Sequence, residues 1–147
     1  MPVKTKSIYD PPELEDGIRV LITRYYPRGV KRDRFQRRIV ALSPSRGLLS
    51  SYRDGEKDWD QFSTSFLSEL RANPESLEAI RSLHALSQVQ DVTLLCYERS
   101  GAPCHRYLVR DLVAAPDLIS GRPEGEAGKR KRSEPSRGTR RARGTAR

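Results

Sequence analysis

The most informative part of the sequence for the fold is Asp91-Val92-Thr93-Leu94-Leu95-Cys96-Tyr97-Glu98, followed closely by Pro103-Cys104-His105-Arg106-Tyr107. Its apolar and β-branched run lacks alternation, which is typical of a strand that is covered on both faces. Beyond Pro103 the spacing of Leu108, Leu112 and Ala115 indicates a helix. A strand, a short loop and a helix start are the unit on which α/β proteins build ligand sites. We therefore expect a site in this stretch.

Two further strands are predicted upstream of this one. The run Ile18–Thr23 is apolar and β-branched, whereas Val3–Tyr9 has few apolar positions and fits an edge strand. A long, mostly helical stretch separates Ile18–Thr23 from Asp91, and such a crossover joins parallel neighbours. The sequence thus predicts an α/β fold with a small, mostly parallel sheet of about three to four strands flanked by helices.

Four helical segments are predicted between the second strand and Asp91. Phe35, Ile39 and Leu42 have helical spacing after Lys31, and Ser43-Pro44 fits the start of a short helix. Two more helices are expected to begin near Asp58 and at Asn73-Pro74. We interpret the apolar stripe of the third helix as hydrophobic core; it consists of Trp59, Phe62, Phe66 and Leu70. His84, among leucines of the fourth helix, is interpreted as a packing residue.

The charge is divided unevenly along the chain, which has 147 residues and a net charge of +9. Residues 1–120 hold 18 of the 28 Lys and Arg and 16 of the 19 acidic residues, a net +2. Residues 121–147 carry +7, with no apolar periodicity, and are predicted to be a disordered tail rich in Arg and Lys. We therefore predict one α/β domain over residues 1–120 and a basic tail over 121–147.

Several classes of protein are excluded by composition. Two cysteines are too few for a disulfide framework or a four-cysteine zinc site. The N-terminus has no apolar run of the kind that a signal peptide needs, and no segment is apolar over the length of a bilayer. We expect a cytoplasmic protein with reduced thiols and no membrane partner.

A second loop of interest, Arg24–Gly29, follows the predicted strand Ile18–Thr23. If the two strands are parallel neighbours, this turn and the loop after Cys96 open beyond the same edge of the sheet, where ligands of open α/β sheets bind. Arginine side chains match phosphate and carboxylate groups. We therefore predict a pocket for an anionic ligand, and the residues expected to bind it are Arg24, Tyr26, Arg28 and Arg106.

Three side chains of the same pocket are candidate catalytic groups. Glu98 and His105 can exchange protons near neutral pH, and Cys104 at a helix start beside a histidine can act as a nucleophile. Two alternatives stay open: Glu98 in a structural ion pair with an arginine, and Cys104 as an inert buried thiol. A metal set of Cys96, Glu98, Cys104 and His105 is a further open alternative, but it has no recognised metal-binding spacing; no metal ligand is therefore assigned, and the cofactor is left unknown.

The chain resembles the domain-of-unknown-function family 488 over about residues 3–115. The likeness rests on ordered motifs, which are Ile8–Pro12, Asp16–Leu21, Arg24–Val30, Leu42–Ser45, Trp59–Phe62, Glu69-Leu70, Thr93–Glu98 and Cys104–Arg106. The resemblance implies a small prokaryotic α/β domain with no established activity. Thr23 and Tyr26 stand where the family motif usually has Asp and Trp. The basic tail lies outside the likeness.

Three functions are compatible with these residues. The first is binding of a phosphate-bearing or other anionic ligand at the two loops, with or without catalysis. The second is nonspecific nucleic-acid binding through residues 121–147 and the basic stretch Lys31–Arg38, driven by counterion release. The third is an accessory protein without chemistry. The tail has no aromatic residues, which argues against base stacking there.

Overall fold

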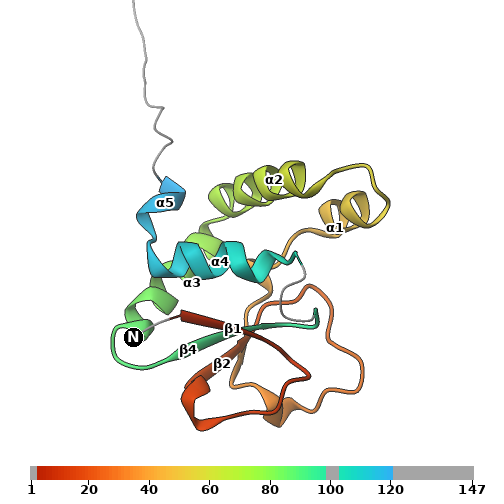
Figure 1. Ribbon diagram of the computed structural model, residues 1–147. Coiled ribbons are helices and arrows are strands. Elements are labelled where there is room, and N and C mark those ends of the chain that lie inside the picture. The colour runs from red at the N-terminus through yellow and green to blue at the C-terminus, as the bar shows by residue number, and fades with distance from the viewer. Residues whose placement is uncertain (1–2, 99–102, 121–147) are drawn as a thin grey trace, which may run out of the picture. The chain divides into compact units, whose positions relative to one another are not determined.

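Four parallel strands form one sheet in a computed structural model that describes residues 3–98 and 103–120 (Figure 1). The order across the sheet is β1-β4-β2-β3. The strands are β1 (Val3–Ser7), β2 (Ile18–Leu21), β3 (Arg37–Arg38) and β4 (Val92–Cys96). This arrangement confirms the predicted α/β class with a parallel sheet. The tail that we predict to be disordered, residues 121–147, lies outside the described residues.

The central strand is β4, which begins the decisive stretch of the sequence. It pairs with β1 on one side, where Val3 faces Val92, and with β2 on the other, where Ile18 faces Val92. All five of its side chains are buried, as expected for a parallel strand covered on both faces. The edge position predicted for the first strand is also confirmed, since β1 ends the sheet.

Helices cover one face of the sheet. In Figure 1 the helices of residues 46–114 lie together above the strands, and α3 (Pro74–Ser87) and α4 (His105–Ala114) are next to the sheet. Helix α2 (Trp59–Ala72) packs on α3, and α1 (Arg46–Arg53) packs on α2. A separate unit from residue 117 onward contains the short helix α5 (Asp117–Ser120). No helix in the described part of the chain is long and apolar enough to cross a membrane.

Two helix starts are confirmed at the predicted residues. Asp58 caps α2 by accepting a hydrogen bond of 2.8 Å from the Gln61 N–H, and the Gln61 side chain accepts one from the Asp58 N–H in return. This reciprocal pair satisfies two backbone donors that the first turn leaves without partners. The Asn73 side chain caps α3 by accepting a hydrogen bond of 3.0 Å from the Glu75 N–H, and Pro74 is the first residue of the helix.

Connections rather than helices cover the opposite face of the sheet. Ile8, Leu21 and Leu95 form a buried cluster there, against which Val30 and Phe35 pack. Leu21 and Leu95 are direct neighbours across β2 and β4, so their side chains share a face. The segment between β2 and β3 is therefore part of the core, since it supplies the apolar cover of this face.

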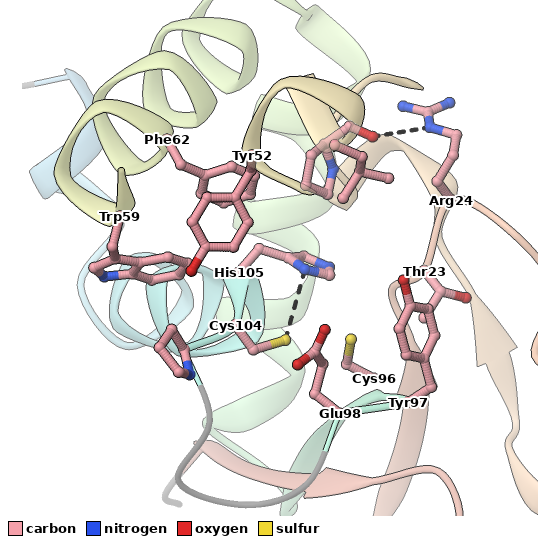
Figure 2. Close-up of a pocket in the computed structure, with 13 residues that line it drawn as sticks. Thr23, Arg24, Tyr52, Trp59, Phe62, Cys96, Tyr97, Glu98, Cys104 and His105 are labelled. Carbon is pink, nitrogen blue, oxygen red and sulfur yellow. Dashed lines mark hydrogen bonds between the residues drawn. The ribbon is translucent and has the colours of Figure 1, made fainter. Parts of the chain in front are cut away.

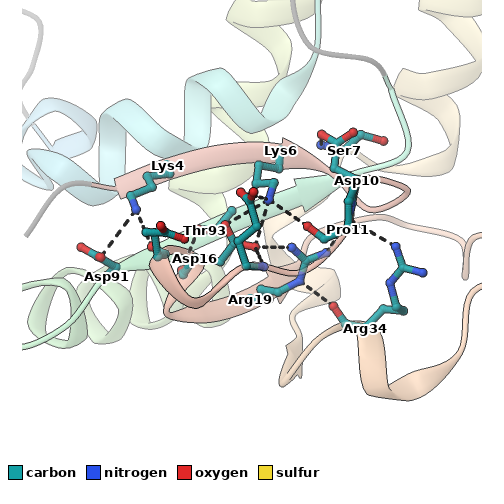
Figure 3. Close-up of polar contacts among 12 residues, drawn as sticks. Lys4, Lys6, Ser7, Asp10, Pro11, Asp16, Arg19, Arg34, Asp91 and Thr93 are labelled. Atoms are coloured by element: carbon teal, nitrogen blue, oxygen red, sulfur yellow. Dashed lines mark hydrogen bonds and ion pairs between the residues drawn. The ribbon is translucent and has the colours of Figure 1, made fainter.

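A buried ionic cluster is centred on Asp16, in the connection between β1 and β2 (Figure 3). Asp16 binds Arg19 at 2.5 Å and Lys6 at 3.1 Å, and its backbone carbonyl accepts a hydrogen bond of 2.7 Å from Thr93 in β4. Burial raises the pKa of Asp16, but hydrogen bonds from the Glu13 N–H, Lys6 and Arg19 outweigh it and hold that pKa below its usual value. The cluster ties the β1–β2 connection to the middle of the sheet.

The prediction of a helix after Lys31 is wrong. Residues 32–34 and 40–42 form single 3₁₀ turns, and between them β3 pairs with the open edge of β2. The Gln36 N–H donates to the Arg19 carbonyl at 2.9 Å, and the Ile39 N–H donates to the Leu21 carbonyl at 2.9 Å. The edge of β2 offers backbone carbonyls as hydrogen-bond acceptors, whereas a short isolated helix is only marginally stable. Pairing with β2 is therefore favoured over the helix that the spacing of apolar residues indicates.

The start predicted for the short helix α1 is two residues early. Ser45, not Ser43, is the N-cap, and its side chain accepts a hydrogen bond of 3.2 Å from the Leu48 N–H. Glu69 of α2 accepts hydrogen bonds from both the backbone and the hydroxyl of Ser45. Ser43 donates instead to the Val40 carbonyl. The cap is therefore selected by a contact with α2, which only the tertiary structure supplies.

Candidate functional site

A pocket opens beyond the carboxyl ends of β2 and β4, the two strands whose loops are predicted to meet. Thr23 and Arg24 come from the end of β2, and Cys96, Tyr97 and Glu98 come from the end of β4. The start of α4 contributes Pro103, Cys104 and His105. The structure thus brings four of the seven predicted site residues to one pocket, and these are Arg24, Glu98, Cys104 and His105.

Aromatic side chains form the opposite wall of this pocket. Figure 2 shows the rings of Tyr52, Trp59 and Phe62 across from Cys104 and His105. Trp59 stacks on Phe62 with ring centroids 5.2 Å apart, and Tyr52 contacts both rings. The enclosed space is about 40 Å³, which is room for roughly three water molecules. Only a small group can enter it without movement of the walls.

His105 is fixed in one tautomer at the inner end of the pocket. Its Nε2 lies 2.6 Å from the carbonyl oxygen of Ile22, and a carbonyl only accepts, so Nε2 carries the proton. The other nitrogen, Nδ1, lies 3.7 Å from Cys104 Sγ (Figure 2). Burial lowers the pKa of His105 to about 4, with a further contribution from the nearby Arg106 charge. At neutral pH the ring is therefore uncharged and presents a lone pair toward the thiol.

The two thiols of the chain form a buried pair. Cys104 donates a hydrogen bond to Cys96, which lowers the pKa of Cys96 and, together with burial, raises the pKa of Cys104. The Glu98 N–H also donates to the sulfur of Cys96. Negative charge is thus favoured on Cys96 while Cys104 stays protonated. The sulfurs of both residues and a ring nitrogen of His105 lie within 4.8 Å of one another, so these three residues could hold a metal ion.

Arg106 supports the loop from behind. Its side chain is completely buried, and Nη1 donates a hydrogen bond of 2.7 Å to the backbone carbonyl of Glu98. A second nitrogen donates to the Tyr107 hydroxyl at 3.2 Å. The guanidinium therefore joins the end of β4 to the start of α4, and it lies outside the set of residues that line the pocket.

Arg24 stands at the rim. Its Nε donates to the Pro44 carbonyl at 3.0 Å and one Nη donates to the Ser43 carbonyl at 3.4 Å. Figure 2 shows the guanidinium directed away from the group formed by Cys104, His105 and Glu98. It is half-buried, and the carbonyl contacts fix its position at the pocket entrance.

Tyr26 and Arg28 lie away from the pocket lining. The Tyr26 hydroxyl donates to the Val30 carbonyl at 2.8 Å, and its ring meets Phe35 edge-on. Arg28 is exposed, and its backbone carbonyl accepts a hydrogen bond from Tyr9. The turn Arg24–Gly29 runs from the pocket rim toward the loop-covered face of the sheet, so its first residue lines the pocket and the later ones pack elsewhere.

Sequence reasoning misses the aromatic wall. The spacing of Trp59 and Phe62 is that of a buried helix face and indicates core, and Phe62 is indeed buried. The same face lines the pocket because the start of α2 projects over the end of β4. Periodicity cannot separate these roles. Thr23 and Cys96 also line the pocket, and their place at strand ends is the signal that could have found them.

Comparisons with known proteins find relatives of most of the chain. The family model described as the active DUF488-N3 subclade matches residues 3–116, which include every residue of the pocket. The uncharacterized protein YeaO of Escherichia coli K12 is 27% identical over 116 residues, covering 76% of this chain and 96% of YeaO. The uncharacterized proteins Mb3100c of Mycobacterium bovis and Rv3073c of Mycobacterium tuberculosis are each 29% identical over 93 residues, 62% of this chain and 78% of theirs. No solved structure matches.

Proposed function

The chain belongs to the active DUF488-N3 subclade, and we propose that it binds a small ligand in the pocket between β4, α4 and α2 and acts on it there. The observation that carries this proposal is the convergence of Glu98, Cys104 and His105 on an enclosed space faced by aromatic rings. A small concave pocket with a few polar groups and perturbed pKa values is typical of a functional site.

The pocket suits a flat molecule that ends in a small anionic group. The aromatic wall offers Trp59 and Tyr52, both partly exposed, to a flat apolar portion at the pocket mouth. The Arg24 guanidinium faces away from the inner end of the pocket, so the positive charge that it supplies for a phosphate or carboxylate lies at the entrance. The inner space of the pocket, about 40 Å³, admits only a small polar group of the ligand.

Among the polar groups, Glu98 is the one that we assign to proton transfer. His105 is uncharged at neutral pH because burial lowers its pKa to about 4, so it serves as a hydrogen-bond acceptor and not as an acid. The thiol of Cys104 is held in its protonated form by Cys96, which weakens the case for Cys104 as the nucleophile. Glu98 lines the pocket with its carboxylate facing the two cysteines (Figure 2).

Trp59 makes the proposal testable because it is the only tryptophan of the chain. Phenyl phosphate carries both features of the ligand, a flat ring and an anion, whereas phenol and inorganic phosphate carry one each. Titration with phenyl phosphate should change Trp59 fluorescence saturably, with a dissociation constant on the order of 1 mM, a value typical of so small a ligand. Each single-feature probe should bind more weakly.

The matched variants are Arg24→Gln at the rim and Arg81→Gln on the exposed side of α3. Removal of one charge-assisted hydrogen bond should weaken phenyl phosphate binding about tenfold in the first and leave it unchanged in the second. No saturable fluorescence change up to about ten times that concentration would sink the pocket proposal. If both variants bound phenyl phosphate equally well, the proposal that Arg24 binds an anionic group of the ligand would be wrong.

Nucleic-acid binding is a second candidate, and the charge distribution within the folded part favours it. Residues 24–46 carry eight Lys and Arg against one Asp, whereas the rest of residues 1–120 carries ten against fifteen acidic residues. Most of these basic side chains are exposed, and so are Tyr25 and Tyr26. Arg32 and Arg38 lie over the Tyr26 ring. Arginines interleaved with aromatic rings suit a single-stranded nucleic acid.

Two changes test this candidate separately from the pocket. The triple variant R32Q/R37Q/R38Q alters the folded surface, and a chain that ends at Ser120 removes the +7 of residues 121–147. If nucleic acid is a ligand, each change should reduce the slope of binding against salt for a single-stranded oligonucleotide, by about one unit for each phosphate that the protein no longer neutralises. Unchanged slopes in both chains would count against nucleic-acid binding, while phenyl phosphate binding should persist in each.

A further inference from the structure

Cys96, Cys104 and His105 place three potential metal ligands, two sulfurs and one imidazole nitrogen, at one buried point. Cys96 ends β4, Cys104 is the N-cap of α4, and His105 is the first residue of that helix. Their ligand atoms lie within 4.8 Å of one another, and all three residues are buried. Two sulfurs bound to one Zn²⁺ lie about 3.8 Å apart, given zinc–sulfur bonds of about 2.3 Å. The observed spacing therefore needs shifts of less than about 1 Å to match.

His105 already has the arrangement of a metal ligand. Its Nε2–H donates to the carbonyl oxygen of Ile22 at 2.6 Å, which leaves Nδ1 with a lone pair on the side of Cys104 Sγ. Histidines that bind metals almost always donate their other ring N–H to a carbonyl or carboxylate, which fixes the ring orientation. Here that outer contact comes from the residue that follows β2, so the sheet itself orients the ring.

Cys104 keeps its proton without a metal ion, but the surroundings of both sulfurs support thiolates once a cation replaces the thiol protons. Backbone N–H groups donate to them, from Glu98 to Cys96 and from Arg106 to Cys104. The buried Arg106 guanidinium adds a positive charge close to both sulfurs and holds the Glu98 carbonyl at 2.7 Å. Two thiolates beside one arginine and one divalent ion give a local charge near +1. Such a site is far less costly to bury than two unpaired thiolates.

We propose that Cys96, Cys104 and His105 bind a thiophilic transition-metal ion, Zn²⁺ in the first place, with its fourth position open to the pocket. The pocket of about 40 Å³ borders all three residues, so a water or a ligand atom has room at that position. Glu98 lines the same space and is placed to bind that water. Three protein ligands with an open fourth position are typical of catalytic zinc sites and not of structural ones.

This inference deepens the proposed function and rests on it, because the ion lies at the inner end of the ligand pocket. A metal-bound water is more acidic than free water, which would give Glu98 a proton to accept. A Cu⁺ ion would bind the same thiolates without that chemistry. The competing interpretation is a metal-free dithiol.

Cobalt absorption is the most direct test, performed on the full chain under reducing conditions after removal of metal with a chelator. Co²⁺ should bind at one ion per chain and produce thiolate-to-cobalt charge-transfer absorption, which surface carboxylates cannot produce. Zn²⁺ should displace it stoichiometrically and, at a hundredfold excess over its dissociation constant, raise Tm by about 10 °C. If Cu⁺ alone displaced the cobalt and Zn²⁺ did not, the assignment to zinc would be overturned.

The chain offers a clean set of variants, since it contains two cysteines and two histidines in all. Cys96→Ser, Cys104→Ser and His105→Gln should each reduce metal affinity at least tenfold. The control is His84→Gln, because His84 instead bonds the Val113 carbonyl at 2.8 Å and lies outside the cluster. Circular dichroism checks that each variant folds. If a variant does not fold, the wild-type protein still tests the proposal. Absence of charge-transfer absorption from the wild-type protein at stoichiometric Co²⁺ would overturn it.

Failure of the metal site and failure of the ligand pocket are distinguishable. Arg24→Gln should keep full cobalt absorption while its phenyl phosphate affinity falls, because Arg24 is not in the cluster. If wild-type protein binds phenyl phosphate but shows no cobalt charge transfer, the metal inference falls and the pocket stands. If it binds cobalt through thiolates but no phenyl phosphate, the metal stands and the proposed ligand falls.

Discussion

His105 illustrates how single residues determine this site. Its ring is held between the Ile22 carbonyl and the Cys104 sulfur, and its edge-on contact with Phe66 connects it to α2. The sequence indicates His105 as a candidate through its position after a helix start. It cannot indicate the tautomer, because the Ile22 carbonyl is 83 residues away in the chain. The neighbours that give a side chain its chemistry are set by the fold.

Gly17 is a residue whose conformation the fold requires. Its φ is +63°, and a Cβ added there would lie 2.1 Å from the Asp91 carbonyl oxygen, next to the start of β4. Gly17→Ala should therefore lower the free energy of unfolding by about 3 kcal/mol or more. Gly47→Ala in α1 is the matched control, because nothing lies within 4 Å of an added Cβ. It should be neutral or stabilising by up to about 1 kcal/mol in urea unfolding. Equal effects would contradict the steric account.

Asp16 should make stability depend on acid pH. Its pKa is lowered in the folded protein, so the stability that it contributes is complete above the ordinary value of 3.8 and is lost as pH falls through the folded value. Asp16→Asn should cost about 3 kcal/mol at pH 7, because it leaves the buried Arg19 without its counter-ion. Its unfolding free energy should then change less than that of the wild type below pH 4. Glu56→Gln, at an exposed position, should behave like the wild type; a parallel pH curve for Asp16→Asn would refute this role.

At the scale of elements, the pocket depends on where α2 begins. Its first turn contains Trp59 and Phe62, which form the aromatic wall, and Asp58 fixes that turn through its cap. The cap is predictable from the sequence because it is a local pattern. The segment after Lys31 is not, because its backbone donors bond to β2 and thereby override a local helical spacing. Local signals therefore predict most element starts, while contacts between distant segments decide the rest.

Removal of the α2 cap should affect both stability and the pocket. Asp58→Ala eliminates the side-chain acceptor for the Gln61 N–H and should cost about 1 kcal/mol in chemical unfolding. Because the first turn then frays, phenyl phosphate affinity measured by Trp59 fluorescence should fall by a few-fold, in proportion to the fraction of frayed helix. Glu56→Ala, exposed in the preceding loop, serves as the control. A destabilised Asp58→Ala with unchanged affinity would separate the α2 start from the ligand site.

At the scale of the whole domain, the parallel sheet explains why two distant loops share a pocket. The carboxyl ends of β2 and β4 are adjacent, so Arg24 and Glu98 meet although 73 residues separate them. This much follows from the prediction that the two strands are parallel neighbours. The burial of the Arg106 side chain cannot be predicted in this way, because the guanidinium is held by the backbone carbonyl of Glu98 in the loop after β4. The excess of basic residues in the segment 24–46 is likewise visible in the sequence. Only the structure shows that most of these basic side chains are exposed.

Amide chemical-shift mapping of the ¹⁵N-labelled full chain during titration with phenyl phosphate shows where on the protein the ligand binds. It separates the pocket from the basic surface residues within a single experiment. If the ligand binds in the pocket, the perturbed amides will cluster at Thr23-Arg24, Cys96–Glu98 and Cys104-His105, with the Trp59 indole N–H among them. Perturbations confined to residues 28–38 would contradict it, because the anion would then be bound by exposed arginines outside the pocket.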